Sequence, residues 1–411
     1  MGIFSALSLN RTEAVLVIHV DVGTGNCRAA LLTWHGDKKN RLPRMLYTAQ
    51  RNEKISRIRH VKHFPLTLAS LREQLTQTRE YISKKAHDGH HYRVGTVYVV
   101  LGSPYYLSHT ALIKYREPKG FVITPDLVSS LVHSHRTLQS ENAEQADLES
   151  LGQNPVTVAE RIIHTKVNGY AISAPYGKRA KMLDLSVFKT EVASSVIQSM
   201  KREVEKFFAC PLYFEPLSLA IYVGLRDHVH FEEDFLFVVV GSEITEISLV
   251  RNGSLLETVS FPFGKNALIR HVARDIKSTE NVVKELLPIY ARGELQDEAL
   301  SSLNAALSSG AQKWFPFFEK ALVSLSDFST VPQFVYVVGD PEVSLIFKSF
   351  IETDTFAGQS LVPTGFEVIP VDTEKAKTVM QFEEDASCDT LLCLEGLFAL
   401  STKLPVHQHE T

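Results

Sequence analysis

Residues 14–33 constrain the fold of this chain most strongly, because they read as two apolar strands joined by a turn that contains glycine. The turn is Asp21-Val22-Gly23-Thr24-Gly25-Asn26. Its two glycines allow the backbone to approach a ligand closely, Thr24 and Asn26 offer short polar side chains, and Asp21 can hold a hydrated magnesium ion. These features are typical of a hairpin that binds a nucleoside triphosphate. An ordinary hairpin with two glycines in its turn is the alternative.

A second hairpin of the same kind occupies residues 235–250, where an apolar strand runs through the turn Gly241-Ser242 into another strand. Arg251-Asn252-Gly253-Ser254 predicts a further tight turn and a third strand. Gly264 and Lys265 then open a long helical stretch. The order of hairpin, helical stretch, hairpin and helical stretch predicts two related halves that face one another across a nucleotide cleft. We place Gly241, Ser242, Gly264 and Lys265 in this predicted nucleotide site.

This pattern resembles the actin-like ATPase superfamily, and within it the FtsA/PilM type of protein. Asp21-Val22-Gly23-Thr24-Gly25 matches the first phosphate motif of that superfamily, and residues 240–246 lie where the second belongs. Gly339 ends an apolar run at the place of the adenosine motif. The resemblance implies an α/β fold of the actin-like (ribonuclease H-like) class with two lobes. It also implies ATP and magnesium as ligands, with Asp21 holding the metal through water and Gly339 contacting the adenosine.

Residues 103–192, between the two phosphate hairpins, resemble the small α+β SHS2-type domain that FtsA and PilM insert into the first half of the fold. Thr124 followed by Pro125 predicts the start of a helix, and Asn168-Gly169 predicts a turn between two strands. In the family this module is a protein-interaction surface. We therefore expect it to receive a cytoplasmic peptide of a membrane protein or a second copy of the chain. Aromatic side chains anchor many interfaces, and the candidates, some of which we expect in the core, are Tyr105, Tyr106, Tyr170 and Tyr176.

The resemblance divides the chain into six segments. They are a first lobe (1–102), the inserted domain (103–192), the first lobe continued (193–230), a second lobe (231–385) with a helical subdomain near 270–330, a closing helix (386–404) and a polar tail (405–411).

Departures from the family pattern bear on catalysis. Active relatives usually carry an aspartate at the position of Val240, where it orients magnesium or the attacking water, and a valine does neither. Glu243 and Glu246 lie nearby, but a shift of one residue along a strand changes the face of the sheet. We therefore expect nucleotide binding with weak or absent hydrolysis, and we assign no catalytic residue. A working ATPase or sugar-type kinase and an interaction module with a closed cleft are the alternatives.

The bulk composition agrees with a cytosolic protein. The 411 residues have a formal net charge of -4, which argues against nucleic acid as a partner, and no apolar run is long enough to cross a bilayer. Residues 403–411 are too polar for the membrane helix expected at the end of FtsA. We therefore expect a scaffold protein of type IV pilus assembly, or of cell division, at the inner face of the membrane. Its attachment there would be indirect, through a protein partner.

Overall fold

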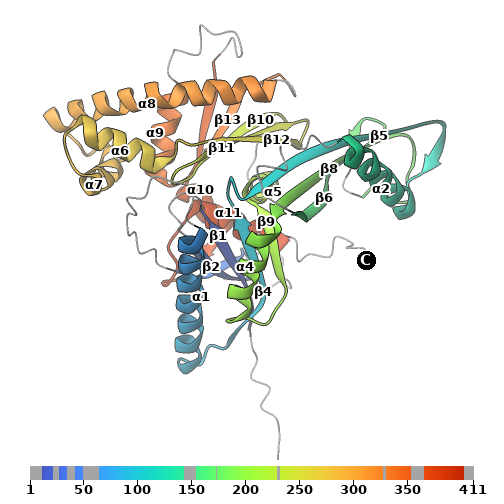
Figure 1. The fold of residues 1–411 in the computed structure, drawn as a ribbon, viewed down its shortest axis with the longest axis horizontal. Coiled ribbons are helices and arrows are strands. Elements are labelled where there is room, and N and C mark those ends of the chain that lie inside the picture. The colour runs from blue at the N-terminus through green and yellow to red at the C-terminus, as the bar shows by residue number, and fades with distance from the viewer. Residues whose placement is uncertain are drawn as a thin grey trace, which may run out of the picture. The chain divides into compact units, whose positions relative to one another are not determined.

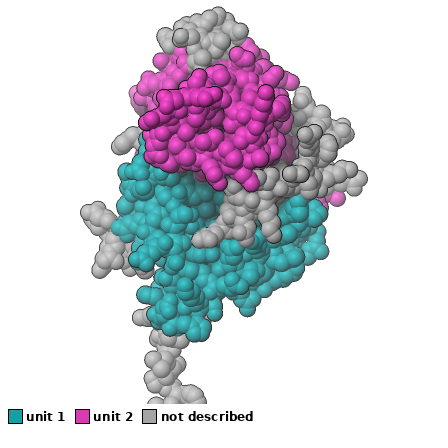
Figure 2. Space-filling view, turned by 90° about the vertical axis from the view of Figure 1, so that its left-hand side faces the viewer, with its two compact units in different colours: residues 1–101, 198–228, 373–411 teal, residues 102–197, 229–372 magenta. Residues whose placement is uncertain are grey.

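The computed structural model divides into two compact units. Unit 1 comprises residues 1–101, 198–228 and 373–411, and unit 2 comprises residues 102–197 and 229–372 (Figure 2). The residues that the structure describes are 12–21, 27–34, 42–49, 64–142, 154–172, 174–228, 232–326, 330–352 and 365–401.

Unit 1 is built on a six-stranded sheet with the order β15-β3-β2-β1-β4-β9. Strands β1 (Thr12–Val20), β2 (Cys27–Thr33) and β3 (Arg44–Thr48) form an antiparallel meander. Strands β4 (Tyr92–Leu101) and β9 (Leu212–Pro216) extend the sheet in parallel with β1, and β15 (Gln381–Phe382) is a short edge strand.

Helices cover the unit 1 sheet. Helix α1 (Phe64–His87) and helix α11 (Thr390–Ser401) both pack against β1 and β2, and α11 also packs against α5 (Leu217–His228). Helix α10 (Thr373–Val379) packs against α11. All residues of α11 from Thr390 to Leu400 are buried, as are all residues of β1 from Ala14 to Val20. A strand that is covered on both faces reads as a continuous apolar run, which is why residues 14–20 lack alternation.

Unit 2 repeats this arrangement in a five-stranded sheet with the order β12-β11-β10-β13-β14 (Figure 1). Strands β10 (Phe235–Val240), β11 (Thr245–Arg251) and β12 (Ser254–Phe261) form the antiparallel meander, and β13 (Phe334–Val338) and β14 (Glu367–Val371) run parallel to β10. The predicted turn before β12 is confirmed, because Asn252 and Gly253 both have positive φ angles. The shared strand order of the two sheets confirms that the chain has two related halves.

Four helices accompany this sheet: α6 (Lys265–Asp275), α7 (Glu280–Ala291), α8 (Asp297–Ser326) and α9 (Pro341–Ile351). Trp314 of α8 is fully buried in their common core, where it stacks on Phe318 and meets Phe347 of α9 edge-on.

The remaining sheet of unit 2 has four antiparallel strands in the order β5-β8-β6-β7. They are β5 (Tyr106–Val122), β8 (Arg179–Ala193), β6 (Pro155–Val167) and β7 (Tyr170–Ala171). Helix α2 (Pro125–Asn142) packs against β5 and shares an apolar cluster with this sheet, and α4 (Ser194–Glu205) follows β8.

Two predictions for this inserted segment are confirmed. Thr124 Oγ1 accepts a hydrogen bond from the backbone N–H of Leu127, so Thr124 caps α2, which begins at Pro125. Asn168 and Gly169 have φ angles of 53° and 89°, and they form the tight turn between β6 and β7. Both positive angles fit the hairpin turn that Asn-Gly pairs favour.

Hydrogen bonds join the four-stranded sheet to the five-stranded sheet within unit 2. Thr110 Oγ1 donates to the carbonyl of Leu255 at 2.6 Å, and the hydroxyls of Ser186 and Ser254 lie 3.0 Å apart. The segment that follows β4 of unit 1 in sequence thus packs against β12 of unit 2.

Candidate functional site

The first hairpin carries Asp21 directly after β1. Asp21 is 9% exposed and follows the carboxyl end of β1, which is an inner strand of the sheet. Gly23, Thr24, Gly25 and Asn26 lie outside the described residues. Their part in the predicted phosphate site therefore stays a prediction.

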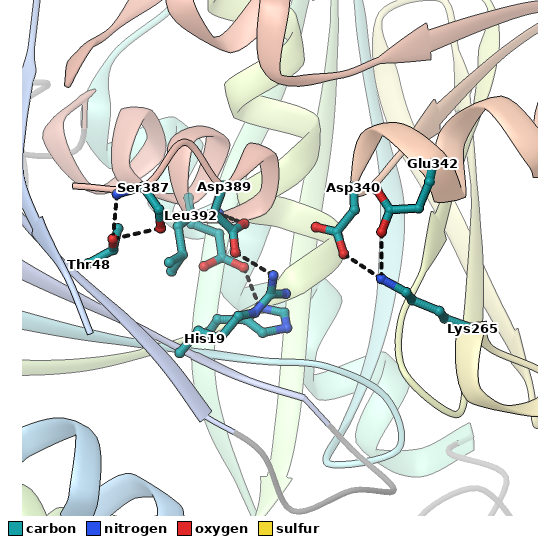
Figure 3. Close-up of polar contacts among 10 residues, drawn as sticks. His19, Thr48, Lys265, Asp340, Glu342, Ser387, Asp389 and Leu392 are labelled. Carbon is teal, nitrogen blue, oxygen red and sulfur yellow. Dashed lines mark hydrogen bonds and ion pairs between the residues drawn. The ribbon is translucent and has the colours of Figure 1, made fainter. Parts of the chain in front are cut away.

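A buried acid–histidine pair lies beside Asp21 in unit 1. His19 Nδ1 lies 2.6 Å from Glu395 Oε1, where His19 comes from β1 and Glu395 from α11 (Figure 3). Glu395 is fully buried, and within the described structure its Oε2 atom has no hydrogen-bond partner. Burial raises the pKa of Glu395 well above its ordinary value, Arg28 opposes this effect, and the charges of Asp389 and Asp21 add to it. A protonated, neutral Glu395 fits this environment, because a buried carboxylate with an unsatisfied oxygen is costly.

Two further contacts hold the start of α11. Asp389 caps this helix by accepting a hydrogen bond from the N–H of Leu392, and Arg28 of β2 lies 2.5 Å from the same carboxylate. Thr48, at the end of β3, exchanges hydrogen bonds with Ser387 at 2.7 and 2.8 Å (Figure 3). The hairpin strands are therefore joined by polar contacts to α11 and to the segment directly before it.

Sequence reasoning missed the pairing of His19 with Glu395. A signal was present, because Glu395 is the one charged residue in the apolar run 391–400 and His19 is the one polar residue in the run 14–20. Two lone polar residues in two buried segments are candidates for each other's hydrogen-bond partner.

We expect Glu395→Gln to gain stability relative to the natural protein as the pH rises above the ordinary carboxyl pKa of 4.5. The folded chain binds the proton of Glu395 more tightly than the unfolded chain, so the stability linked to that proton is present at low pH. It is lost as the pH rises from the ordinary value of 4.5 through the raised pKa of the folded protein. Glutamine keeps the hydrogen bond without a titrating proton.

Thermal unfolding at several pH values measures this difference. Glu203→Gln is the matched control, because hydrogen bonds from Arg72 and Lys206 lower the pKa of Glu203, and its effect on stability should be constant over the same range. A Glu395→Gln protein that is less stable by the same amount at every pH would show instead that Glu395 is ionised in the folded protein.

The second hairpin of unit 2 is braced by the start of α6. The N–H of Lys265 donates to the carbonyl of Gly241 at 2.9 Å, and the N–H of Asn266 donates to that of Ser242 at 2.8 Å. A Cβ atom on Gly264 would lie 2.4 Å from the Gly241 oxygen, so the turn rests directly on this glycine. Free N–H groups at a helix start bind anions. Here the turn itself occupies two of them.

Lys265 does not present a free charge. Its Nζ atom lies 3.0 Å from Asp340 Oδ2 and 2.8 Å from Glu342 Oε1 (Figure 3). Burial by itself lowers the pKa of Lys265, but the two carboxylates overcome this effect and raise it. The lysine is thus a cation that joins α6 to the start of α9. Of the predicted residues of unit 2, Gly241, Ser242 and Gly339 remain as candidates for nucleotide contacts.

Gly339 differs from Gly264 in its surroundings. A Cβ atom there would meet only Val343, at 3.5 Å, which is an ordinary contact. Packing and backbone conformation therefore do not require glycine at this position. A close approach of adenosine to Gly339 stays a prediction.

Neither glutamate near Val240 is available for catalysis. Glu243 accepts two hydrogen bonds from Arg270, at 2.8 and 2.7 Å. Glu246 is buried and accepts hydrogen bonds from the backbone N–H of Ser103 and the hydroxyl of Tyr106, both at 2.6 Å. Glu246 therefore holds the beginning of β5 to the second hairpin.

The described residues contain no group of three or more His, Cys, Asp and Glu side chains that could hold a metal ion. A single magnesium held through water by Asp21 stays a prediction. No helix in the described part of the chain is long and apolar enough to cross a membrane.

Comparisons of the structure with solved structures establish the fold. A chain of a structure described as a PilM–PilN type IV pilus biogenesis complex matches with a TM-score of 0.55 and 13% sequence identity. The match covers 94% of this chain and 98% of that one. This chain has an actin-like fold.

Weaker matches accompany this one. A Bacteroides thetaiotaomicron protein with an actin-like ATPase fold and unknown function has a TM-score of 0.33 at 11% identity, over 94% of this chain and 95% of that one. The cytoplasmic domain of EpsL, from the type II secretion system of Vibrio cholerae, has a TM-score of 0.29 at 12% identity, over 61% and 71%. No protein-family model matches the chain, and no curated protein matches it in sequence.

The comparisons confirm the predicted actin-like fold class. The finer assignments, which are the SHS2 type of the insertion and the choice between the FtsA and PilM types, stay predictions.

Proposed function

We propose that this protein is an assembly scaffold of a type IV pilus or a related secretion machine. The observation that carries the proposal is the match to the PilM–PilN complex over nearly the whole of both chains. Because the sequence identity of this match is low, the match shows a common fold only, and the role in pilus assembly is our inference. In this role the protein acts at the inner face of the membrane, where it binds the cytoplasmic segment of a membrane protein.

The inserted segment supplies exposed side chains for such a partner. Tyr170 and Tyr176 are 76% and 44% exposed, whereas Tyr105 is half-buried and Tyr106 is buried against Glu246. The first two tyrosines are therefore the candidate anchors that remain from the sequence analysis.

The proposed role is tested with the pilus-assembly membrane proteins of the source organism. Their cytoplasmic segments, as labelled synthetic peptides, are titrated with the full-length protein, and one of them should bind saturably. Tyr170→Ala with Tyr176→Ala should weaken this binding. Disruption of the gene should abolish pili and leave cell division intact. Filamentous cells with normal pili would contradict the pilus assignment and favour the division role.

The contacts within unit 2 favour weak nucleotide binding at most. Lys265 is neutralised by Asp340 and Glu342, and the first N–H groups of α6 are occupied. These features also support a second candidate, an interaction module that has lost its nucleotide.

A thermal-shift titration with magnesium-ATP separates these two candidates. Binding at about 100 times the dissociation constant adds roughly 2.7 kcal/mol, which we expect to raise the melting temperature by several degrees. Asp21→Ala should reduce the shift, because it removes the carboxylate expected to hold hydrated magnesium. Asp88→Ala, at an exposed turn of unit 1, is the control and should leave the shift unchanged. No shift at millimolar magnesium-ATP would favour the interaction module.

A further inference from the structure

One end of the four-stranded sheet gathers segments that are distant in sequence. In the strand register, Lys114 of β5 and Lys166 of β6 both lie opposite Asp184 of β8, and further along Val122 of β5 lies opposite Arg179 of β8. Strand β7 and the Asn168-Gly169 turn lie at the same end. We call residues 114–122, 166–172 and 174–182 the basic end of the sheet. Strand β5 reaches it beside α2, at the right of Figure 1.

The basic end carries a strong local charge. It contains one acidic residue, Glu117, and seven basic residues: Lys114, Arg116, Lys119, Lys166, Lys178, Arg179 and Lys181. Six of the seven are exposed and Lys166 is half-buried. The whole chain, in contrast, has a net charge of -4. The positive charge is therefore a property of this end and not of the composition.

Most of these cations are not neutralised by neighbouring acids. Arg116 forms an ion pair with Asp184, in which Nη1 lies 2.5 Å from Oδ1. Among the described residues, no ion pair joins Lys119, Lys178, Arg179 or Lys181 to a carboxylate. Asp184 is engaged by Arg116, and Asp126, in the first turn of α2, is a further acidic residue near this end. The cations are consequently free to bind an anionic surface.

Exposed apolar and aromatic side chains accompany the charges. Tyr170 is 76% exposed, Val122 is 51%, Tyr176 is 44% and Met182 is 38%. Ala180, in contrast, is buried with the adjacent Leu183 in the apolar cluster that this sheet shares with α2. Lysines and arginines interspersed with exposed apolar groups and tyrosines match the boundary of a bilayer, where headgroups and acyl chains meet.

We propose that the basic end of the four-stranded sheet binds the surface of a lipid bilayer that carries anionic headgroups. Lys119, Lys178, Arg179 and Lys181 contact the headgroup phosphates. Val122 and Met182 enter the boundary between headgroups and acyl chains. Exposed aliphatic side chains favour lipid over a single-stranded nucleic acid, whose bases stack on aromatic rings. They also favour lipid over an acidic peptide, which would not need them. This inference goes beyond the proposed scaffold role and does not rest on it.

Co-sedimentation of the full-length protein with vesicles tests the proposal. Vesicles of phosphatidylcholine are compared with vesicles in which part of this lipid is replaced by phosphatidylglycerol. We expect binding to the second kind only, and we expect added salt to weaken it, because salt screens surface charges. Lys178→Glu with Lys181→Glu should reduce partitioning by at least about tenfold, since each cation near an anionic bilayer contributes substantially. Val122→Ser with Met182→Ser should reduce it more weakly.

Lys313→Glu with Lys320→Glu is the matched control. Both lysines are exposed on α8, and this variant changes the net charge by the same amount as the first. It should bind the vesicles like the natural protein. Equal losses in both charge variants, or equal binding to both kinds of vesicle, would overturn the proposal. Binding of a single-stranded oligonucleotide or a polyglutamate peptide by this end, without vesicle binding, would overturn it in favour of those ligands. If the natural protein binds vesicles but none of the pilus-assembly peptides, the result counts against the scaffold role alone.

Discussion

Replacing Val240 by aspartate is expected to lower the melting temperature by on the order of 10 °C and to leave ATP hydrolysis at background. Val240 is 5% exposed and belongs to the apolar cluster of unit 2. Along β10 it shares a face with Leu236 and Val238, which lie in the same cluster. An aspartate at this position would therefore be an unpaired carboxyl group in an apolar core, at a cost of about 3–5 kcal/mol. The acid that active relatives carry would not be restored in a working position.

The natural protein is also expected to release phosphate from ATP at background rates. Val240→Thr is the matched control, because threonine has nearly the same shape and introduces only a hydroxyl group, so its loss of stability should be smaller than that of the aspartate. Both quantities are measured by thermal unfolding and by phosphate release from purified protein. An aspartate variant as stable as the natural protein would contradict the burial of position 240 in the apolar core. Robust turnover by the natural protein would contradict the expected loss of hydrolysis.

Replacing Gly264 by alanine is expected to be strongly destabilising, while Gly339→Ala is expected to be nearly neutral. The added methyl group on residue 264 would lie 2.4 Å from the Gly241 oxygen and 2.7 Å from the Glu243 nitrogen. Both obstacles are backbone atoms of a turn that is fixed by hydrogen bonds from Lys265 and Asn266. The φ angle of Gly264 is -110°, which alanine tolerates, so the cost comes from space alone and is about 1–3 kcal/mol or more.

Gly339→Ala is the control for this experiment, since the new methyl group would only touch Val343 at 3.5 Å. Denaturant unfolding should give a lower midpoint for the first variant and an unchanged midpoint for the second. The same two proteins report on the nucleotide. If adenosine approaches Gly339, its alanine variant loses the magnesium-ATP thermal shift while keeping full stability. Equal stability of both variants would contradict the tight packing of Gly264 on the turn.

The pairing of Lys265 with Asp340 and Glu342 shows how the two predicted motifs of unit 2 depend on each other. Lys265 follows the second hairpin, and Asp340 follows Gly339 directly, 75 residues further along the chain. Packing of α6 and α9 against one sheet brings their first turns together. Desolvation by itself would lower the pKa of Lys265, and the two carboxylates raise it, so the lysine keeps its charge. A substitution at any of the three residues therefore changes the environment of the other two.

Much of the fold followed from local patterns. The apolar runs 14–20 and 235–240 predicted strands, and these strands lack alternation because both of their faces are buried. Asn168-Gly169 and Asn252-Gly253 predicted turns, because the positive φ angles of such turns suit these residue types. The repeated order of hairpin and helical stretch predicted two related sheets.

The sequence by itself thus determined the strands, the tight turns and the internal repeat, since these depend on the periodicity and conformational preferences of neighbouring residues. Only the tertiary structure decided which polar residues meet. It paired His19 with Glu395, 376 positions apart in sequence. It gave Lys265 and Glu246 hydrogen-bond partners, and it buried Val240 in an apolar core. The physical reason is that burial and partners over long sequence separations set the charge and the availability of a side chain. A motif specifies the type of residue at a position, but the residues packed around it decide whether that residue can bind a ligand.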